Sequence, residues 1–323
     1  MDADETPQRL AWPLIERLRP ARRIRGISAV LVPFTADGDI DWTAFEAHVA
    51  RTHAAGLMPA VNMDTGYVQL LDDASKLRVL DIAQSVTAGA FVAGAFVADG
   101  EGSRFDLDGY MAAARAIVQR GGTPVMFPSY GLNELSDDAW VRALGSIGDR
   151  VDQFIGFELG PMFVPYGRIV SLDAYQGMLD ISACVGAKHS SLSRHLEWDR
   201  LALRDAIRPD FMVLTGNDLA IDMVMYGSDY LLGLSTFAPE LFAKRDAMWT
   251  AGDADFYELN DALQYLGHFT FRAPVPAYRH NAAMWFELRG WSSTSVTPAG
   301  VPRRPTSDRE ILASILETLQ RWS

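Results

Sequence analysis

Short apolar runs alternate with amphipathic stretches along most of the chain. In the amphipathic stretches, apolar side chains such as Trp42, Phe45 and Val49 recur at helical spacing, which predicts helices that pack one face on a core. The apolar runs are the predicted strands: Gly26–Pro33, Leu57–Met63, Ala90–Ala98, Thr123–Pro128, Phe154–Leu159, Ala183–Lys188, Phe211–Thr215 and Tyr230–Ser235. Strands that alternate with helices lie parallel and are joined by right-handed crossovers. Eight such strands close a barrel, so the pattern predicts an α/β protein with a (β/α)8 TIM barrel.

The pattern changes near both ends of the chain. After Glu240 we predict helices only, at Leu241–Thr250, Ala254–Gly267, Tyr278–Arg289 and Asp308–Arg321, and before the first strand only one short helix over Leu10–Leu18. We therefore divide the chain into an N-terminal arm (1–24), the barrel (25–240) and a C-terminal helical extension (241–323). An open doubly wound sheet is the alternative, but the first strand ends in Pro33-Phe34-Thr35 with no glycine-rich dinucleotide-binding turn after it.

Composition and charge narrow the class of protein. The 49% hydrophobic content of 323 residues is ample for a large core, and the longest apolar stretch, Ala90–Ala98, is too short to span a bilayer. The chain opens with Asp2, Asp4 and Glu5, unlike a secretory signal, and its single cysteine fits a reducing compartment. A formal net charge of −12 argues against nucleic acid and anionic membranes as partners. We expect a cytoplasmic enzyme with a small-molecule substrate.

Lys188 is the residue with the most unusual position in the sequence. Of the 29 Lys and Arg residues three are lysines, at 76, 188 and 244, which leaves 26 arginines. Lys188 ends the apolar run Cys184-Val185-Gly186-Ala187, whereas the other two lie in charged, helix-like stretches. A desolvated lysine can lose its proton and attack a carbonyl group, which arginine cannot do. The alternative is an amine that only pairs with a carboxylate at the strand end.

Several other polar residues follow the predicted strands. Catalytic groups of (β/α) barrels come from the C-terminal ends of the strands and the loops after them. At these ends lie Asp64-Thr65-Gly66-Tyr67, Ser129-Tyr130, Glu158, Lys188, Gly216-Asn217-Asp218 and Ser235. Strand alternation turns His189 away from the interior, and Asp218 is expected to cap a helix starting at Leu219. An amine, carboxylates, a phenol and hydroxyl groups at one rim suit carbonyl chemistry.

From about Gly26 to Thr250 the chain resembles the dihydrodipicolinate synthase and N-acetylneuraminate lyase family of class I aldolases. The resemblance rests on Gly26 to Phe34 with the turn at 37–41, Pro128-Ser129-Tyr130, Gly186-Ala187-Lys188, Thr215-Gly216-Asn217-Asp218 and Gly233-Leu234-Ser235. It implies that Lys188 forms an imine with the substrate and that Tyr130 reaches into a neighbouring subunit's site. It also implies a homodimer or homotetramer, substrate contacts at Gly216 and Ser235, and no metal or organic cofactor, because the imine itself accepts electrons.

Three departures from the family pattern concern the site. The family's second-strand loop reads Gly-Thr-Thr-Gly-Glu; here Thr65 and Gly66 remain to hold a substrate carboxylate, but Asp64 replaces the first threonine. Asp64 would repel that carboxylate unless it is protonated or paired. Glu158 stands where the family has a proton-relaying tyrosine, three residues before Pro161, and we expect it to take over that role at the barrel mouth. The family's arginine beyond the proline is missing; Arg168 is the candidate replacement.

Three functions remain open from the sequence. The leading hypothesis is a Schiff-base lyase, of aldolase or hydro-lyase type, that acts on a 2-oxo acid or related keto compound and is not the lysine-pathway synthase. Lys188, Glu158 and Tyr130 would be its catalytic residues. The second is a metal-dependent barrel epimerase or isomerase that uses Asp64, Glu158 and Asp218 as ligands. The third is a non-catalytic relative that binds a small ligand, since a fold does not imply a function.

Overall fold

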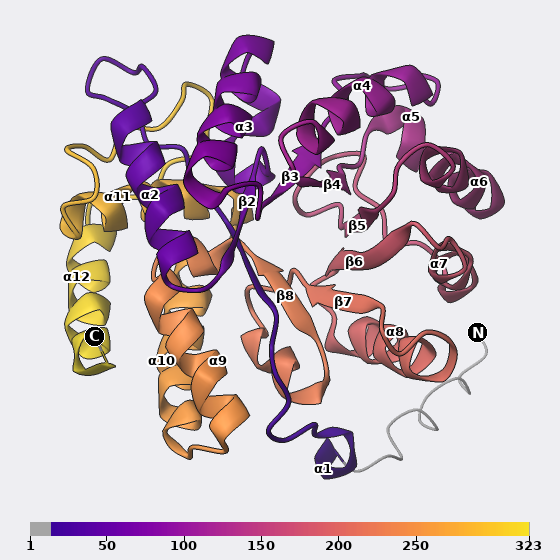
Figure 1. Ribbon diagram of the computed structural model, residues 1–323. Coiled ribbons are helices and arrows are strands. Elements are labelled where there is room, and N and C mark those ends of the chain that lie inside the picture. The colour runs from indigo at the N-terminus through magenta and orange to yellow at the C-terminus, as the bar shows by residue number, and fades with distance from the viewer. Residues whose placement is uncertain (1–13, 323) are drawn as a thin grey trace, which may run out of the picture.

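Parallel strands form a closed barrel at the centre of the computed structural model, which describes residues 14–322 (Figure 1). In the described chain each strand pairs with its sequence neighbour, and β8 closes the ring on β1. The strands are β1 (Gly26–Ala29), β2 (Met58–Val61), β3 (Val92–Ala95), β4 (Thr123–Met126), β5 (Phe154–Leu159), β6 (Cys184–Ser190), β7 (Met212–Thr215) and β8 (Asp229–Leu232). Each predicted strand overlaps an observed one, so the predicted TIM barrel is confirmed.

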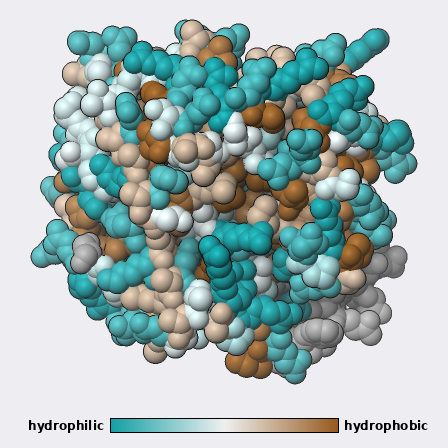
Figure 2. All heavy atoms as spheres, in the orientation of Figure 1, coloured by the Kyte–Doolittle hydropathy of each residue, from teal (hydrophilic) through white to brown (hydrophobic). Residues whose placement is uncertain are grey.

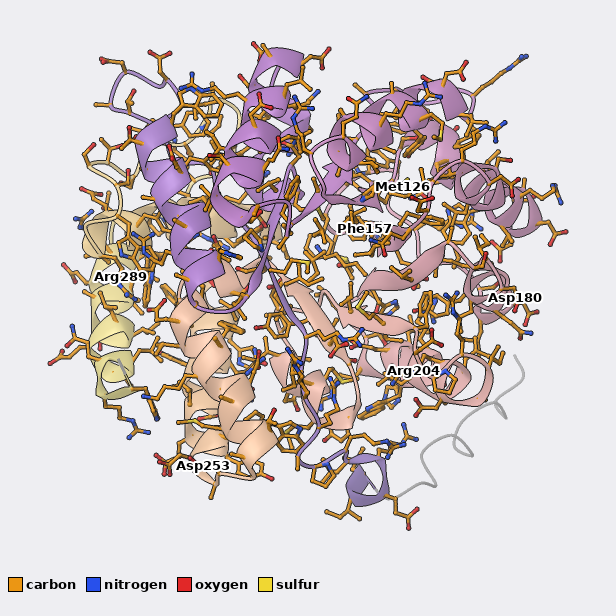
Figure 3. All side chains as sticks on the ribbon, in the orientation of Figure 1. Met126, Phe157, Asp180, Arg204, Asp253 and Arg289 are labelled. Atoms are coloured by element: carbon orange, nitrogen blue, oxygen red, sulfur yellow. The ribbon has the colours of Figure 1, made fainter. Side chains whose placement is uncertain are left out.

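Two hydrophobic clusters, one on each side of the strands, hold the barrel together. The inner core fills the barrel and includes Ile27, Ala60, Ile155, Phe157 and Leu159. The larger outer core lies between the strands and the surrounding helices. Because successive side chains of a strand point to opposite faces, Phe157 belongs to the inner core while the Glu158 side chain points outward. Figure 3 shows Phe157 within the ring of strands, with Asp180 and Arg204 out among the helices.

Helices surround the barrel, and all but the last of them connect its strands. They are α2 (Trp42–Ala54), α3 (Asp73–Thr87), α4 (Leu107–Val118), α5 (Tyr130–Asn133), α6 (Asp137–Gly148), α7 (Leu172–Leu179), α8 (Arg194–Ile207) and α9 (Pro239–Ala251). Asp or Ser side chains cap the N-termini of several, as Asp41 does for α2 and Ser193 for α8. Only a 3-10 helix, Ile221–Tyr226, joins β7 to β8. The expected α-helix from Leu219 is therefore not formed.

The N-terminal arm and the C-terminal extension lie against different parts of the barrel. The extension, defined above as 241–323, contains nearly all of α9 together with α10 (Asp255–Thr270), α11 (Tyr278–Leu288) and α12 (Asp308–Leu319), and α10 lies beside α9 in Figure 1. In the arm the structure describes a short helix, α1 (Leu14–Arg17), while residues 10–13 of the predicted Leu10–Leu18 helix lie outside the described range. Between residues 14 and 322 no helix is both long and apolar enough to cross a membrane.

Candidate functional site

Lys188 lies on the inner face of β6, near the C-terminal end of the barrel. It pairs in register with Phe157 of β5, and its Nζ lies 4.5 Å from the centroid of the Phe157 ring. The residue is 9% exposed. Burial lowers the pKa of Lys188, and the charges of Asp218 and Asp64 offset only part of that shift. A lowered pKa increases the fraction of unprotonated amine, which is the form that attacks a carbonyl carbon.

Asp218, in the loop after β7, is the second titratable group in this part of the barrel. It is 4% exposed, and its carboxylate accepts a hydrogen bond from the backbone N–H of Leu234 at 2.7 Å. Burial raises the pKa of Asp218 to about 7, although this hydrogen bond and the Lys188 charge act in the opposite direction. Asp218 does not cap a helix, because Asn217 accepts the hydrogen bond from Leu219 N. An acid with this pKa can both accept and donate a proton near neutrality.

Gly216 and Ser190 lie directly beside the lysine side chain. A Cβ atom at Gly216 would sit 2.8 Å from Lys188 Cε and 2.1 Å from Ser190 Oγ, so a larger residue at 216 would displace both. Ser190 Oγ is buried and has no hydrogen-bond partner among the described residues. Buried hydroxyl groups are normally hydrogen-bonded. The sequence analysis did not select Ser190, although it follows Lys188 by two positions and therefore shares its face of β6.

The loop after β2 meets the C-terminal extension at the same end of the barrel. Thr65 Oγ1 lies 2.8 Å from the Tyr278 hydroxyl oxygen, and the Tyr278 hydroxyl also donates to Asp64 Oδ2 at 3.3 Å. Arg279 Nη1 lies 3.3 Å from Asp64 Oδ1 and donates to Asp64 O at 3.1 Å. Asp64 is thus paired with Arg279. This pairing meets the condition stated above under which a substrate carboxylate can approach Asp64. The sequence did not indicate that Tyr278 and Arg279 contact the β2 loop, because their positions in a predicted helix fit packing against the barrel equally well.

Tyr130 and a second tyrosine lie together near this end of the barrel. The Tyr130 and Tyr166 ring centroids are 4.5 Å apart. Asp99 fixes the backbone of α5 by accepting hydrogen bonds from the N–H groups of Tyr130 and Gly131 at 2.9 and 2.7 Å. Burial, together with the charges of Asp99 and Asp64, raises the pKa of Tyr166 to about 12. The sequence analysis did not select Tyr166, although it lies two positions before Arg168.

Glu158 does not face Lys188, so its predicted place at the barrel mouth is wrong. It pairs in register with His189, on the outer face of the barrel. Its carboxylate accepts hydrogen bonds from Arg200 at 2.7 and 2.8 Å and lies 2.7 Å from His189 Nδ1. Burial alone would raise the pKa of Glu158, but His189 and Arg200 outweigh it and hold the pKa at about 2. Strand alternation, which correctly placed His189, also places Glu158 beside it.

Arg168, Ser235 and Gly66, which the sequence analysis assigned to substrate binding, all have hydrogen-bond partners within the protein. Arg168 donates to the carbonyl oxygens of Asn133 and Leu135 and pairs with Asp137, so its guanidinium is occupied at the ends of α5 and α6. The buried Ser235 hydroxyl lies 2.8 Å from Ser28 Oγ and 2.9 Å from Leu232 O. The Gly66 N–H donates to Met63 O at 3.0 Å. All three polar groups are satisfied within the protein, and only Gly216 of the predicted glycine contacts lies against Lys188.

The carboxylates proposed as metal ligands do not form one cluster. Glu158 lies on the outer face of the barrel with Arg200, whereas Asp218 and Asp64 both influence Lys188 inside it. Among residues 14–322 no group of three or more His, Cys, Asp or Glu residues is arranged to hold a metal ion.

Solved structures of known proteins are similar to this one, whereas comparisons of the sequence found no match. No protein-family model matches the chain, and no curated protein matches it significantly. A putative dihydrodipicolinate synthetase from Pseudomonas aeruginosa aligns with a TM-score of 0.76 at 17% identity, over 92% of this chain and 99% of that one. A prophage protein of the dihydrodipicolinic acid synthase family from E. coli K12, in complex with pyruvate, aligns with a TM-score of 0.77 at 17% identity, over 92% and 98%.

A variant of 2-keto-3-deoxygluconate aldolase from Sulfolobus solfataricus is also similar. It aligns with a TM-score of 0.69 at 17% identity, over 92% of this chain and 96% of that one. These likenesses extend over nearly the whole of each chain, so they include the C-terminal helices as well as the barrel. At this level of identity they establish the fold.

Proposed function

We propose that this protein is a Schiff-base lyase, of aldolase or hydro-lyase type, that acts on a 2-oxo acid or a related keto compound. The observation that carries the proposal is the pair formed by Lys188 and Asp218. One is a buried amine with a lowered pKa and the other a buried carboxyl group with a raised pKa, and each affects the pKa of the other. Opposite shifts in neighbouring titratable groups are typical of a catalytic acid/base assignment.

In the proposed reaction, the unprotonated Nζ of Lys188 adds to the ketone carbon of the substrate. The carbonyl oxygen leaves as water, and the protonated imine then withdraws electrons from the adjacent bond that breaks. Asp218 accepts and returns the proton, because its pKa of about 7 is suited to both steps. Glu158 has no part in this scheme, since it lies on the outer face of the barrel.

Hydroxyl groups around the amine are suited to hold the substrate. The Ser190 hydroxyl is free to donate to a substrate oxygen next to the imine. Thr65 Oγ1 lies 2.8 Å from the Tyr278 hydroxyl oxygen, and rotation of the Thr65 hydroxyl would let it donate to a carboxylate group of the substrate. Arg279 pairs with Asp64 and so reduces the repulsion that Asp64 would otherwise exert on that carboxylate. The structural neighbour from E. coli was solved with pyruvate, which supports a 2-oxo acid as the substrate class.

Borohydride trapping tests the proposal directly. The protein is incubated with pyruvate or another 2-oxo acid and borohydride, digested and analysed by mass spectrometry. The peptide that contains Lys188 should gain the mass of the reduced adduct. Lys76 and Lys244 are internal controls, because Lys76 pairs with Asp73 at 3.2 Å and Lys244 donates to Trp322 O at 2.6 Å.

Two results would contradict the proposal. Labelling of Lys76 or Lys244 in place of Lys188 would show that the site described above is not the reactive one. The absence of any adduct across a panel of 2-oxo acids would favour a relative that binds a small ligand without catalysis.

A further inference from the structure

The end of the barrel opposite Lys188 contains a cavity. Its volume is about 480 Å³, and Arg23, Arg25, Ile27, Ile155 and Met212 are among its lining residues. We call it the bottom cavity, because it lies at the N-terminal ends of the strands, whereas Lys188 lies near their C-terminal ends. On β5, Ile155 lines the cavity and Phe157, two residues later, contacts Lys188, so inner-core side chains separate the two. Pockets of roughly 300–1,000 Å³ are the usual size for small-molecule sites.

Aliphatic side chains form part of the walls of the bottom cavity, beside the polar side chains that also line it. Ile27, Val92, Ile155, Val185 and Met212 contribute to them, and none of its lining residues is aromatic. Met58, at the same cavity, is 40% exposed although it lies at the start of a barrel strand. Figure 2 shows apolar residues gathered near the centre of one face of the molecule, with hydrophilic residues around them. Apolar side chains that a fold leaves exposed in a concave site are suited to an apolar ligand.

The charged lining residues of the cavity are both arginines. The lining contains Arg23 and Arg25 but no Asp or Glu. Within residues 14–322 neither guanidinium has an ion-pair or hydrogen-bond partner, in a protein whose formal net charge is −12. Their backbone is held in place, because Arg22 Nη1 and Arg25 N both donate to Asp229 Oδ1, at 3.0 and 2.9 Å. Two unpaired guanidinium groups at an acid-free cavity attract an anion.

We propose that the bottom cavity binds a small aliphatic carboxylate. The apolar chain occupies the space lined by Ile27, Ile155 and Met212, and the carboxylate head lies between Arg23 and Arg25. Thr123 and Gln153 also line the cavity; Gln153 Nε2 donates to Thr123 Oγ1 at 3.2 Å, which leaves the Thr123 hydroxyl hydrogen available to the head group. The absence of aromatic rings favours a flexible aliphatic chain over a planar ring. This site is independent of the chemistry proposed at Lys188.

Calorimetric titration with octanoate tests the proposal on the full-length protein. Octanoate should bind with one site per chain, whereas 1-octanol, which lacks the charge, and acetate, which lacks the chain, should bind much more weakly. Arg23→Gln with Arg25→Gln should weaken octanoate binding by roughly 10-fold or more, since hydrogen bonds to charged groups are among the stronger ones. Val185→Phe, which fills the cavity but keeps both arginines, should also reduce binding.

A matched control removes two positive charges elsewhere. Arg115 and Arg142 are exposed on α4 and α6 and do not line the cavity, so the double variant Arg115→Gln with Arg142→Gln should bind octanoate as the unaltered protein does. Equal losses in the two double variants would overturn the proposal, as would the absence of octanoate binding. Protection of Lys188 from borohydride labelling by octanoate would also overturn it, because the ligand would then occupy the other end of the barrel.

Discussion

At the residue scale, Lys188 combines two features that rarely occur together. It is almost completely buried, and among the residues described its Nζ has no ion-pair partner. A buried lysine normally pairs with a carboxylate. Here the charges of Asp218 and Asp64 only partly offset the effect of burial on the pKa of Lys188. The cost of desolvating the amine is the physical reason for proposing Lys188 as the nucleophile.

Lys188→Arg should abolish turnover and leave the fold intact, because arginine keeps the charge but cannot form an imine. Loss of borohydride trapping, with an unchanged circular dichroism spectrum, would be the expected result. Lys244→Arg is the control and should keep full activity, since Lys244 donates to the C-terminal segment at Trp322 O. Retained trapping in Lys188→Arg would contradict the assignment.

Asp218→Asn should lower turnover by on the order of 10²-fold or more, in line with general acid/base contributions. Because the pKa of Asp218 is about 7, the change should also remove an ionisation near that pH from the profile of kcat against pH. Imine formation with borohydride should persist, since the amine remains. Asp180→Asn, at the exposed end of α7, is the control; an unchanged pH profile in Asp218→Asn would exclude this role.

At the element scale, β5, β6 and α8 are joined by a buried charged cluster on the outer face of the barrel, behind Lys188. Glu158 connects Arg200 of α8 with His189 of β6, and its pKa of about 2 lies below the value near 4.5 of a free glutamate. A depressed carboxyl pKa contributes stability that is present above the unfolded pKa and lost as the pH falls toward the folded one. The cluster therefore holds β6, and Lys188 with it, at neutral pH.

Arg200→Gln should lower the free energy of unfolding by about 3–5 kcal/mol at pH 7, because it leaves a buried carboxylate without its ion-pair partner. In the unaltered protein the contribution of Glu158 should decline as the pH falls from about 4.5 to about 2. Urea denaturation at several pH values measures both effects. Arg142→Gln, on the exposed face of α6, should change stability little, and an equal loss in both variants would argue against the cluster.

Helix α11 should contribute to substrate binding through Tyr278. Tyr278→Phe removes the hydroxyl group next to Thr65 and Asp64, so KM for the oxo acid should rise on the order of 10-fold, since hydrogen bonds to charged groups contribute about 1.5–3 kcal/mol. Steady-state kinetics gives KM and kcat separately, and kcat should change less. Tyr257→Phe, at an exposed position of α10, is the control. An unchanged KM in Tyr278→Phe would remove α11 from the site.

At the scale of the whole molecule, Tyr130 raises the question of assembly. By the resemblance to the aldolase family, Tyr130 would serve the site of a neighbouring subunit in a homodimer or homotetramer. Tyr166 packs on Tyr130, so the two phenols would lie together at such an interface. We expect sedimentation at micromolar concentration to show at least a dimer, and Tyr130→Glu to weaken it by placing a charge there. A monomer would remove Tyr130 from the catalytic residues.

The sequence by itself determined the barrel and the position of Lys188. Apolar runs that alternate with helical periods specify parallel strands, because each helix carries the chain back to the start of the next strand. Eight such strands are the number that closes a (β/α) barrel. Lys188 was identified because an amine at the end of a buried run is costly to desolvate. The strand ends were predicted less well: β6 extends to Ser190, and this places a free hydroxyl beside the amine.

Only the tertiary structure decided which side chains share the lysine's surroundings. Register pairs Phe157 with Lys188 and Glu158 with His189, so one position along β5 separates a residue of the inner core from an outward-facing ion pair. Tyr278 is 213 residues away from Thr65 in sequence, yet their hydroxyl oxygens lie 2.8 Å apart. Helical periodicity shows that a helix packs on a barrel, but where it packs depends on the shape of both surfaces, which no local pattern records.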